Sequence, residues 1–366
     1  MTSHLLNIDD FERHAARQMQ QVFFDFFQGG AEDEIAVREN RAAWQRLSFR
    51  PRVLVDVTNR NLATTVLGQP ISMPIFTAPC GFNALAHPDG ELAVARATSA
   101  ANTIQVVSTA GTYSLEEVAA AAPQGLRWFQ LYCYRDRNIT KSLVERAVAA
   151  GYNALCLTVD APFVGRRERD IRNRFGLPPG LRWKNLEAHG HDRMDANDDG
   201  SALAKYIESI WDAGLTWEVV DWLRSLSPLP LVLKGILTAE DARLAVEHGA
   251  QGLIVSNHGG RQLDGAIATA TALPEIVDAV GDQAEIYVDG GIRRGTDVLK
   301  ALALGARAVL IGRPYLWGLT AGGETGVARV LQLLREELSL SLALAGHNDI
   351  ATVGRSLICK TSQTSP

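Results

Sequence analysis

The chain has 366 residues, 46% hydrophobic and 21% charged, with a formal net charge of -5. This composition is typical of a globular protein and gives no reason to expect nucleic acid or a membrane surface as a partner. No stretch approaches the roughly 20 apolar residues that a membrane helix needs. Cys80, Cys133, Cys156 and Cys359 lack the spacing of metal ligands or of a disulfide framework, so we expect no metal site and a cytoplasmic location.

Residues 1–70 are expected to form a helical extension. Asn7 or Asp9 could begin its first helix, Gly29 and Gly30 could end it, and a second helix follows. The helical spacing is carried by Phe11, Ala15, Met19, Val22, Phe23 and Phe26. Because strand signals are almost absent before Leu47, we expect this extension to pack outside or below the main fold.

Between residues 71 and 350, short apolar runs alternate with alanine-rich helical stretches. The runs cover residues 74–79, 105–108, 128–132, 154–160, 231–234, 252–256, 285–289 and 308–312. The helical stretches include residues 90–101, 115–121, 139–150, 239–248, 296–304 and 325–344. Eight such units without a Rossmann-like halving predict an α/β fold, a TIM (β/α)8 barrel in a single domain.

The regular spacing breaks after the fourth predicted strand, between Asp160 and Leu231. This gap is far longer than one helix with its loops, and it contains the polar run HGHDRMDANDDGS. Long insertions of this kind are usually lids or disordered loops. We therefore expect a structureless, mobile lid over about residues 166–205.

The stretch SNHGGRQLD, from Ser256 to Asp264, follows the sixth predicted strand. The chemistry of a barrel lies where its strands pass into loops. His258 has an unperturbed pKa near neutrality, and Arg261 is a planar cation that can hold a carboxylate by two hydrogen bonds. The pair predicts a substrate with an acid group beside the reacting carbon. The alternative is a solvated loop with an incidental histidine and arginine.

Glycine-rich turns follow the last two predicted strands. The stretch DGGIRRG begins at Asp289, and Gly312 and Arg313 follow the eighth strand. Glycines let backbone N–H groups approach a phosphate, and the loops after strands 7 and 8 are the usual phosphate site of this fold. We expect one phosphate group, since no GxGxxG pattern follows a strand. The alternative is a plain turn with surface arginines.

The other strand ends carry groups that could hold a polar, planar ligand. They include Pro79, Ser108, Gln130, Tyr132 and Thr158. Lys234 could be a Schiff-base nucleophile, a phosphate contact or a fixed charge beside a cofactor ring. The polar residues at the neighbouring strand ends favour the last of these roles. Asp160 could cap a helix, or it could orient His258 as the third member of a triad does.

With these residues in place, the chain resembles the family of FMN-dependent (S)-2-hydroxy-acid oxidases and dehydrogenases. Glycolate oxidase, lactate oxidase, hydroxymandelate oxidase and mandelate dehydrogenase belong to it. The likeness covers nearly the whole chain. Its most specific stretches are SNHGGRQLD at Ser256, DGGIRRGTDVLKALALGA at Asp289, IGRP at Ile311, WFQLY at Trp128 and LTVDAP at Leu157.

The resemblance implies an FMN site with three parts. The flavin ring is expected against the backbone of Pro79, Cys80 and Gly81 and the side chains of Ser108, Gln130 and Thr158. Lys234 is expected at one edge of the ring, where it would stabilise the anionic reduced form. The ribityl chain and phosphate are expected on Ser256, Asp289, Gly290, Gly291, Arg293, Gly312 and Arg313.

The resemblance also implies the catalytic residues. His258 would remove a proton from the substrate with support from Asp160, Arg261 and Arg167 would bind the carboxylate, and Tyr132 would bond the hydroxyl or developing carbonyl. Whether the α-hydrogen leaves as a proton or a hydride stays open. The expected reaction converts an (S)-2-hydroxy acid to the 2-oxo acid and gives hydrogen peroxide from oxygen. A quinone, a cytochrome or a protein acceptor stays open, and the family resemblance implies a homotetramer.

Two positions depart from the members that use small acids. Phe26 stands where glycolate and lactate oxidases carry a tyrosine that binds the carboxylate, and Ala110 stands where glycolate oxidases carry a tryptophan. Both changes make the pocket roomier and more apolar. We expect a substrate larger than glycolate, such as an aromatic or extended 2-hydroxy acid. Ala110 also resembles lactate oxidases, so lactate stays an alternative.

Two further alternatives come from other classes of protein. A non-redox isomerase or lyase barrel would need the phosphate site but has no use for Gln130, Lys234 and His258 around a flavin. A degenerate barrel that serves only as a binding subunit would be expected to have lost His258 or Arg261.

Overall fold

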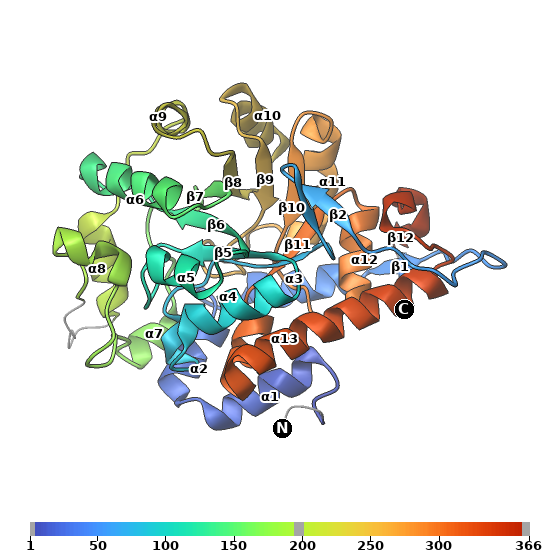
Figure 1. Cartoon of the computed structure of the whole chain (residues 1–366), viewed down its shortest axis with the longest axis horizontal. Coiled ribbons are helices and arrows are strands. Elements are labelled where there is room, and N and C mark those ends of the chain that lie inside the picture. Colours follow the sequence, from blue (N-terminus) through green and yellow to red (C-terminus); the bar gives the residue numbers. More distant parts are fainter. Residues whose placement is uncertain (1–3, 194–200, 361–366) are drawn as a thin grey trace.

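The computed structural model describes residues 4–193 and 201–360. Its centre is a closed barrel of eight parallel strands (Figure 1). The barrel closes where the last strand pairs with the first, and all eight predicted strands are confirmed. The strands are β4 (Ile75–Thr77), β5 (Ile104–Ser108), β6 (Leu126–Leu131), β7 (Ala154–Thr158), β8 (Leu231–Ile236), β9 (Gly252–Val255), β10 (Glu285–Val288) and β11 (Ala308–Ile311).

Strand side chains alternate between the interior of the barrel and the layer of helices around it. The ring of Trp128 packs edge-on against the rings of Phe76 and Tyr287, with both centroid distances at 5.4 Å. Cys156 lies in the same interior cluster. These side chains fill the barrel, so chemistry is confined to its rim.

The helices around the barrel follow the strands in order. They are α4 (Gly90–Ala100), α5 (Leu115–Ala121), α6 (Arg137–Ala149), α9 (Glu218–Leu226), α10 (Ala239–Glu247), α11 (Thr269–Val280), α12 (Gly295–Ala303) and α13 (Arg313–Leu344). The alanine-rich pattern predicted six of them and missed α9 and α11. Helix α13 begins earlier than predicted, at Arg313. A kink with non-helical backbone angles at Gly322 and Gly323 separates its first part from the predicted stretch.

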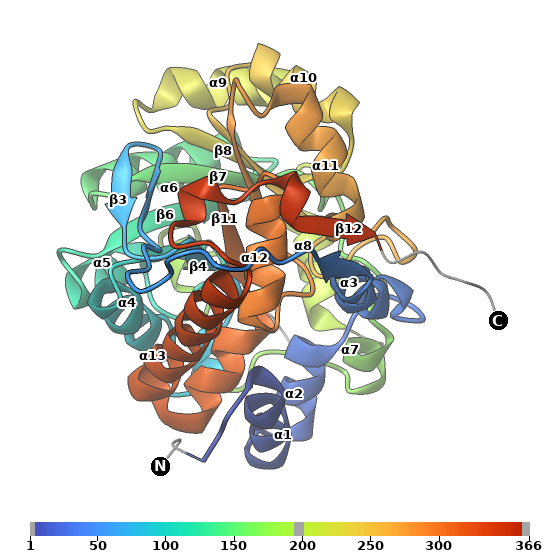
Figure 2. The same ribbon diagram turned by 90° about the vertical axis from the view of Figure 1, so that its right-hand side faces the viewer.

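The N-terminal extension contains α1 (Ile8–Gln18), α2 (Gln21–Gln28) and α3 (Ile35–Gln45). Asn7 caps α1 as predicted. The helix that begins there ends at Gln18, however, and Gly29 follows the second helix, α2. The extension packs outside the barrel as predicted, with α1 against α13 (Figure 2), but at the carboxyl ends of the strands rather than below the barrel. Trp44 Nε1 donates to the carbonyl oxygen of Gly290 at 2.8 Å, and the amide of Ala31 donates to that of Gly260 at 2.9 Å. The extension therefore touches loops at the carboxyl ends of the strands.

Four short strands lie outside the barrel. Strand β1 (Leu47–Phe49) pairs antiparallel with β12 (Ile358–Lys360), and β2 (Thr64–Val66) pairs with β3 (Gln69–Ile71). The β1–β12 pair ties the end of the N-terminal extension to the C-terminal segment. That segment also contains η3 (Ile350–Thr352) and η4 (Arg355–Leu357).

The insertion after β7 differs from the predicted structureless loop in its described part. It contains α7 (Glu168–Arg172), η2 (Lys184–His189) and α8 (Ala202–Ile210). Phe175 and Trp183 are buried, and Trp183 Nε1 donates to the carbonyl oxygen of Thr109 at 2.7 Å. Aromatic burial therefore fixes this part of the predicted lid. Residues 194–200 of its polar run lie outside the described residues, and the mobility of the lid stays a prediction.

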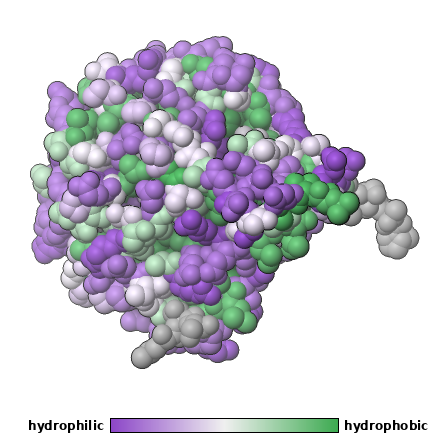
Figure 3. Space-filling view, turned by 45° about the vertical axis from the view of Figure 1, so that its right-hand side comes forward, coloured by the Kyte–Doolittle hydropathy of each residue, from purple (hydrophilic) through white to green (hydrophobic). Residues whose placement is uncertain are grey.

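The surface in Figure 3 is a mosaic of hydrophilic and hydrophobic residues. Among the described helices, none combines the length and the apolar character that crossing a bilayer requires.

Candidate active site

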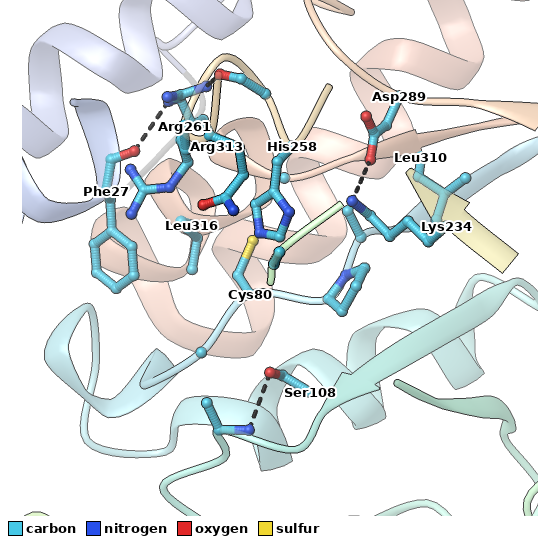
Figure 4. Close-up of a pocket in the computed structure, with 18 of the residues that line it drawn as sticks. Phe27, Cys80, Ser108, Lys234, His258, Arg261, Asp289, Leu310, Arg313 and Leu316 are labelled. Atoms are coloured by element: carbon cyan, nitrogen blue, oxygen red, sulfur yellow. Dashed lines mark hydrogen bonds and ion pairs between the residues drawn. The ribbon is translucent and has the colours of Figure 1, made fainter. Parts of the chain in front are cut away.

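A cavity lies at the carboxyl ends of the barrel strands (Figure 4). The predicted site residues that line it are Phe26, Pro79, Cys80, Gly81, Ser108, Ala110, Tyr132, Arg167, Lys234, His258, Arg261, Asp289, Gly290, Gly291, Arg293, Gly312 and Arg313. The other four lie behind this wall, each hydrogen-bonded to another residue of the predicted site. They are Gln130, Thr158, Asp160 and Ser256. The structure therefore brings the whole predicted set together.

The loop of residues 256–264, here called the His258 loop, carries the central side chain. His258 has a positive φ of 58°, and its amide donates to Ser256 Oγ at 3.0 Å. Its Nδ1 lies 2.8 Å from Asp160 Oδ1. Gly235 makes room for this carboxylate, because a Cβ there would lie 2.5 Å from the Cβ of Asp160. The pairing of Nδ1 with Asp160 leaves Nε2 as the free nitrogen.

Burial sets the charge state of this pair. It lowers the pKa of His258, although Asp160 acts in the opposite direction. Burial also opposes ionisation of Asp160, but His258 and Lys234 outweigh it, so the pKa of Asp160 lies below its usual value. The arrangement holds a neutral imidazole at neutral pH beside an ionised carboxylate, which suits a group that must accept a proton.

The ammonium group of Lys234 has two partners at the cavity. Its Nζ donates to Ser256 Oγ at 2.9 Å and forms an ion pair with Asp289 Oδ2 at 3.3 Å (Figure 4). Burial lowers the pKa of Lys234, but the carboxylates of Asp289 and Asp160 more than offset it and raise that pKa. The ammonium is therefore a fixed positive charge and a poor candidate for a Schiff-base nucleophile.

Gln130 connects three neighbouring strand ends. Its Nε2 donates to Thr158 Oγ1 at 3.0 Å, and its Oε1 accepts from Ser108 Oγ at 3.2 Å and from the amide of Thr109 at 3.3 Å. The backbone amide of Thr109 can only donate, so it fixes which end of the Gln130 side chain carries the oxygen. The strand ends therefore present an ordered row of polar groups.

Three half-buried arginines meet at one side of the cavity. Arg261 and Arg313 both donate to the carbonyl oxygen of Gly29, at 2.6 and 2.8 Å, and Arg167 Nε donates to the carbonyl oxygen of Arg261 at 3.3 Å. Within the described residues, none of the three forms an ion pair with a carboxylate. Burial and the other arginines lower the pKa of Arg167 and of Arg313 to about 9 in each case. An anion placed here would relieve the cost of burying these charges.

Arg313 makes two further hydrogen bonds to backbone carbonyl groups. Its Nε donates to the carbonyl oxygen of Phe27 at 2.9 Å, and its Nη1 donates to that of Gly259 at 3.0 Å. The guanidinium therefore joins α2 to the His258 loop. Its role toward a phosphate stays a prediction.

An apolar wall faces the arginines. Phe26 stacks on Phe175 with centroids 4.1 Å apart and planes 2° apart, and the guanidinium carbon of Arg261 lies 5.3 Å from the centroid of the Phe26 ring. Phe26 thus supports Arg261 through a cation–π contact. Sequence reasoning missed a further apolar part of the cavity lining, which comes from the insertion and includes Trp183, Leu203, Ile207 and Trp211.

Tyr132 lines the same cavity as His258 and packs against this wall. Its ring stacks on Trp211 with centroids 3.9 Å apart and planes 26° apart. Burial raises the pKa of Tyr132 to about 12, so its hydroxyl keeps its proton and can donate a hydrogen bond. The sequence did carry a signal for the missed residues of the insertion. Leu203, Ile207 and Trp211 are spaced four residues apart, which indicates that they share one apolar helical face.

The glycine turn after β10 has the shape of an anion cradle. Gly290 and Gly291 have φ values of 89° and 82°, and a Cβ at Gly291 would lie 2.1 Å from the carbonyl oxygen of Asn40. Helix α13 begins directly after Gly312, which also lines the cavity. Helix N-termini favour anions.

Two of the buried polar atoms that have no hydrogen-bond partner within the described chain belong to the predicted cofactor-binding residues of the cavity lining. They are Arg293 Nε, a donor suited to a phosphate oxygen, and Asp289 Oδ1, an acceptor suited to a hydroxyl. Buried polar groups are normally paired. A phosphorylated polyol carrying a planar ring would pair both atoms and lie along the strand ends, so the residues fit FMN.

The N-terminal extension holds the far end of the His258 loop. Both carboxylate oxygens of Asp264 accept from α3, from the amides of Ala36 and Ile35 at 2.8 and 3.2 Å. Glu34, at the helix start, gives no side-chain cap. The loop thus caps α3, and the helix in turn fixes the loop.

Comparison with known proteins supports this picture over the whole chain. The profile of the family described as FMN-dependent dehydrogenase matches residues 15–360. The L-lactate oxidase of Nostoc sp. (strain PCC 7120) is 53% identical over 356 residues, which cover 96% of this chain and 98% of that protein. The glycolate oxidase of Spinacia oleracea is 51% identical over 355 residues, which cover 97% and 95%.

A solved structure gives the same result for the fold. The crystal structure of mandelate oxidase with (S)-4-hydroxymandelic acid matches with a TM-score of 0.92 and 43% identity, and the match covers 97% of this chain and 98% of that one.

Proposed function

The chain belongs to the FMN-dependent dehydrogenase family, and from this premise we propose that it oxidises an (S)-2-hydroxy acid larger than glycolate to the 2-oxo acid, with oxygen as the electron acceptor. Its use of FMN and its activity as a 2-hydroxy-acid oxidase follow from the family and from oxidase relatives that are 51 to 53% identical. The non-redox barrel and the binding subunit are thereby excluded.

The cofactor site follows from the row of strand ends. The flavin ring is assigned to the side chains of Ser108, Gln130 and Thr158 and to the backbone of residues 79–81, with Lys234 as the fixed charge at one edge. Ser256 and the free oxygen of Asp289 would hold the ribityl hydroxyls. The phosphate would lie against Gly290, Gly291, Arg293, Gly312 and Arg313. FMN held by these residues would supply a two-electron acceptor for the substrate.

The substrate carboxylate is assigned to the arginine cluster. Arg261 and Arg167 have no carboxylate partner within the described residues, and their pKa values are lowered by burial. A carboxylate held by both would supply the missing countercharge and fix the adjacent hydroxyl-bearing carbon. The carbonyl contact of Arg261 with Gly29 and the face of Phe26 keep this guanidinium in place.

His258 is assigned as the base. Its Nδ1 is bonded to Asp160, so Nε2 can take the proton released from the substrate. Asp160 would stabilise the imidazolium that forms, and its carboxylate stays ionised. Tyr132 would donate to the substrate oxygen or hold the developing carbonyl. The overall balance is the loss of two electrons and two protons from the hydroxy acid, and these convert oxygen to hydrogen peroxide.

The size of the substrate is proposed from the wall opposite the arginines, and this is the observation that carries the assignment. Ala110 is small and lines the cavity, and the remaining lining of that wall is apolar and aromatic. An apolar wall favours a substrate with an aromatic ring, as in mandelate or hydroxymandelate, or with an extended aliphatic chain. L-Lactate is the alternative, because its methyl group also suits a small alanine.

Oxygen is proposed as the acceptor because the two relatives described above are both named oxidases. The alternative is a dehydrogenase that passes electrons to a non-oxygen acceptor. The family resemblance also leads us to propose a homotetramer, and the four free cysteines support a reducing, cytoplasmic compartment. Light scattering on the purified protein would test the tetramer.

A substrate panel tests the proposal. Flavin absorbance would be followed without oxygen during addition of glycolate, L-lactate, (S)-mandelate and (S)-2-hydroxyoctanoate, and hydrogen peroxide would be measured after air is readmitted. We expect the highest kcat/KM for mandelate or hydroxyoctanoate. A clear preference for glycolate would contradict the proposed size, and bleaching without peroxide formation would contradict oxygen as acceptor.

A further inference from the structure

Gln262 makes three hydrogen bonds through its side-chain amide, which use both of its N–H groups and one lone pair of its oxygen. Its Nε2 donates to the carbonyl oxygens of Asp160 and Phe163, at 3.0 and 2.7 Å, and its Oε1 accepts from the amide of Gly165 at 3.1 Å. Because two of the partners are carbonyl oxygens and one is an N–H group, they determine which atom of the side-chain amide is the nitrogen and which is the oxygen. The amide therefore recognises the backbone of one turn, residues 160–165.

This side chain belongs to the same loop as His258. The imidazole of His258 holds the carboxylate of Asp160, and Gln262 holds the carbonyl of the same aspartate. The two contacts and the loop between them form a closed ring around Asp160. A residue fixed at its side chain and at its backbone cannot turn its carboxylate away without breaking one of these contacts.

The turn also lies against the backbone beside Gln262. A Cβ at Gly165 would lie 2.4 Å from the carbonyl oxygen of Arg261 and 2.5 Å from that of Gln262, so only glycine allows this approach. Arg167 follows the turn, and its Nε donates to the carbonyl oxygen of Arg261. The position of Arg167 is therefore coupled to the same contact.

We propose that Gln262 is a positioning residue for two parts of the site at once: it aligns Asp160 with His258, and it places the start of the segment that carries Arg167. This inference rests on the proposed roles of His258 as base and of Arg167 as carboxylate ligand. Gln262 lies at the cavity wall but acts through these residues.

Two substitutions separate its hydrogen bonds from its size. Gln262→Met keeps a similar length and removes all three hydrogen bonds. Gln262→Glu keeps the shape but sets carboxylate oxygens against two carbonyl oxygens, which repel them. The matched control is Gln283→Glu, because Gln283 is an exposed glutamine whose side chain, among the residues that the structure describes, bonds to its neighbour Asp282.

The measurements are kcat and KM per bound flavin and the pH dependence of kcat/KM. The charged groups acting on His258 are Asp160, Lys234 and Arg167, and of these Asp160 is the one that raises its pKa. We expect both Gln262 variants to retain FMN absorbance, to lose roughly tenfold to 100-fold in kcat and to show a raised KM. In Gln262→Met the acid limb should move to lower pH, because a misaligned Asp160 raises the pKa of His258 less.

A Gln262→Met variant with unchanged kcat, KM and acid limb would overturn the inference. A reduced melting temperature with unchanged kinetics per bound flavin would also overturn it, because it would show a purely structural role. The double variant Asp160→Asn with Gln262→Met gives an independent check. We expect its kcat to equal that of Asp160→Asn alone, whereas additive losses would overturn the coupling.

The proposed function fails in a distinguishable way. If His258→Ala keeps normal flavin reduction, the base assignment falls. If His258→Ala abolishes reduction while both Gln262 variants behave as the unaltered protein, the base assignment stands and the role of Gln262 falls.

Discussion

Asn40 and Asn257 exchange two hydrogen bonds between α3 and the His258 loop. Nδ2 of Asn40 lies 2.7 Å from Oδ1 of Asn257, and Nδ2 of Asn257 lies 2.9 Å from Oδ1 of Asn40. Both side chains are buried. The residue immediately before the proposed base is thus held by a helix of the N-terminal extension, which makes that extension part of the active-site framework.

Removal of one amide of this pair should destabilise the protein. Asn40→Ala removes one donor and one acceptor from the buried amide of Asn257, which keeps only its bonds to Ile267 and Gly260, and it removes the acceptor of the Thr269 amide. We expect the free energy of unfolding to fall by roughly 1–3 kcal/mol, measured by denaturant unfolding of the FMN-loaded protein. Asn138→Ala, at an exposed helix position, is the control. Equal stability of Asn40→Ala and the control would contradict the role of the pair.

The pH dependence of kcat/KM should report the charge state of His258. Protonated His258 cannot accept a proton, and burial lowers its pKa. Activity should therefore rise with pH and level off above a pKa that lies below the usual value of about 6.5. In Asp160→Asn the carboxylate that raises the pKa of His258 is lost, so the acid limb should move to lower pH while kcat falls.

The protein provides a matched control for this experiment. Asp221 pairs with His248 at 2.9 Å in the same Nδ1 geometry, but at the surface. Asp221→Asn should leave the pH profile unchanged. An acid limb that stays in place or moves to higher pH in Asp160→Asn would contradict the assigned pair.

Arg261→Lys should act mainly on substrate binding. A lysine keeps the charge but cannot offer two parallel hydrogen bonds, and it loses the planar contact with Phe26. We expect KM to rise by about tenfold or more, as the loss of a hydrogen bond to a charged group implies, with a smaller change in kcat. Arg172→Lys, exposed in the insertion, is the control. An unchanged KM would place the carboxylate elsewhere.

Trp211 should support Tyr132 through their stacked rings. Trp211→Ala removes the stack, and an aromatic pair contributes about 0.5–1.5 kcal/mol. We expect kcat for the preferred substrate to fall by roughly twofold to tenfold, as that energy implies, and Trp211→Phe to recover most of it. Stopped-flow flavin reduction measures the effect. If Trp211→Phe loses as much as Trp211→Ala, stacking is not the cause.

The barrel could be predicted from the sequence because its signals are local. Each buried strand is an apolar run of a few residues, and the adjacent glycines and polar residues mark its end. The chemistry of strand ends such as Ser256 and Asp289 could be predicted for the same reason, since the fold places all strand ends at one rim.

The position of the N-terminal extension could not be predicted in this way. Asn40 meets Asn257, 217 residues along the chain, and nothing in the helical periodicity of α3 indicates which loop it covers. The same limit applies to Gln262, whose side-chain amide bonds to three backbone groups of another loop. It applies also to Trp211, because its partner Tyr132 lies in a different part of the chain. Pairings between distant backbone and side-chain groups leave little trace in a single sequence.

Anaerobic reduction of the flavin in His258→Ala tests the account most directly, with His347→Ala, a half-buried histidine outside the cavity lining, as control. Stopped-flow absorbance with the best substrate of the panel gives the rate of the reductive step. We expect His258→Ala to bind FMN normally and to lose about 10² to 10⁴ in this rate, while the control is unchanged. Reduction of His258→Ala at the rate of the unaltered protein would contradict the assignment of His258 as the base.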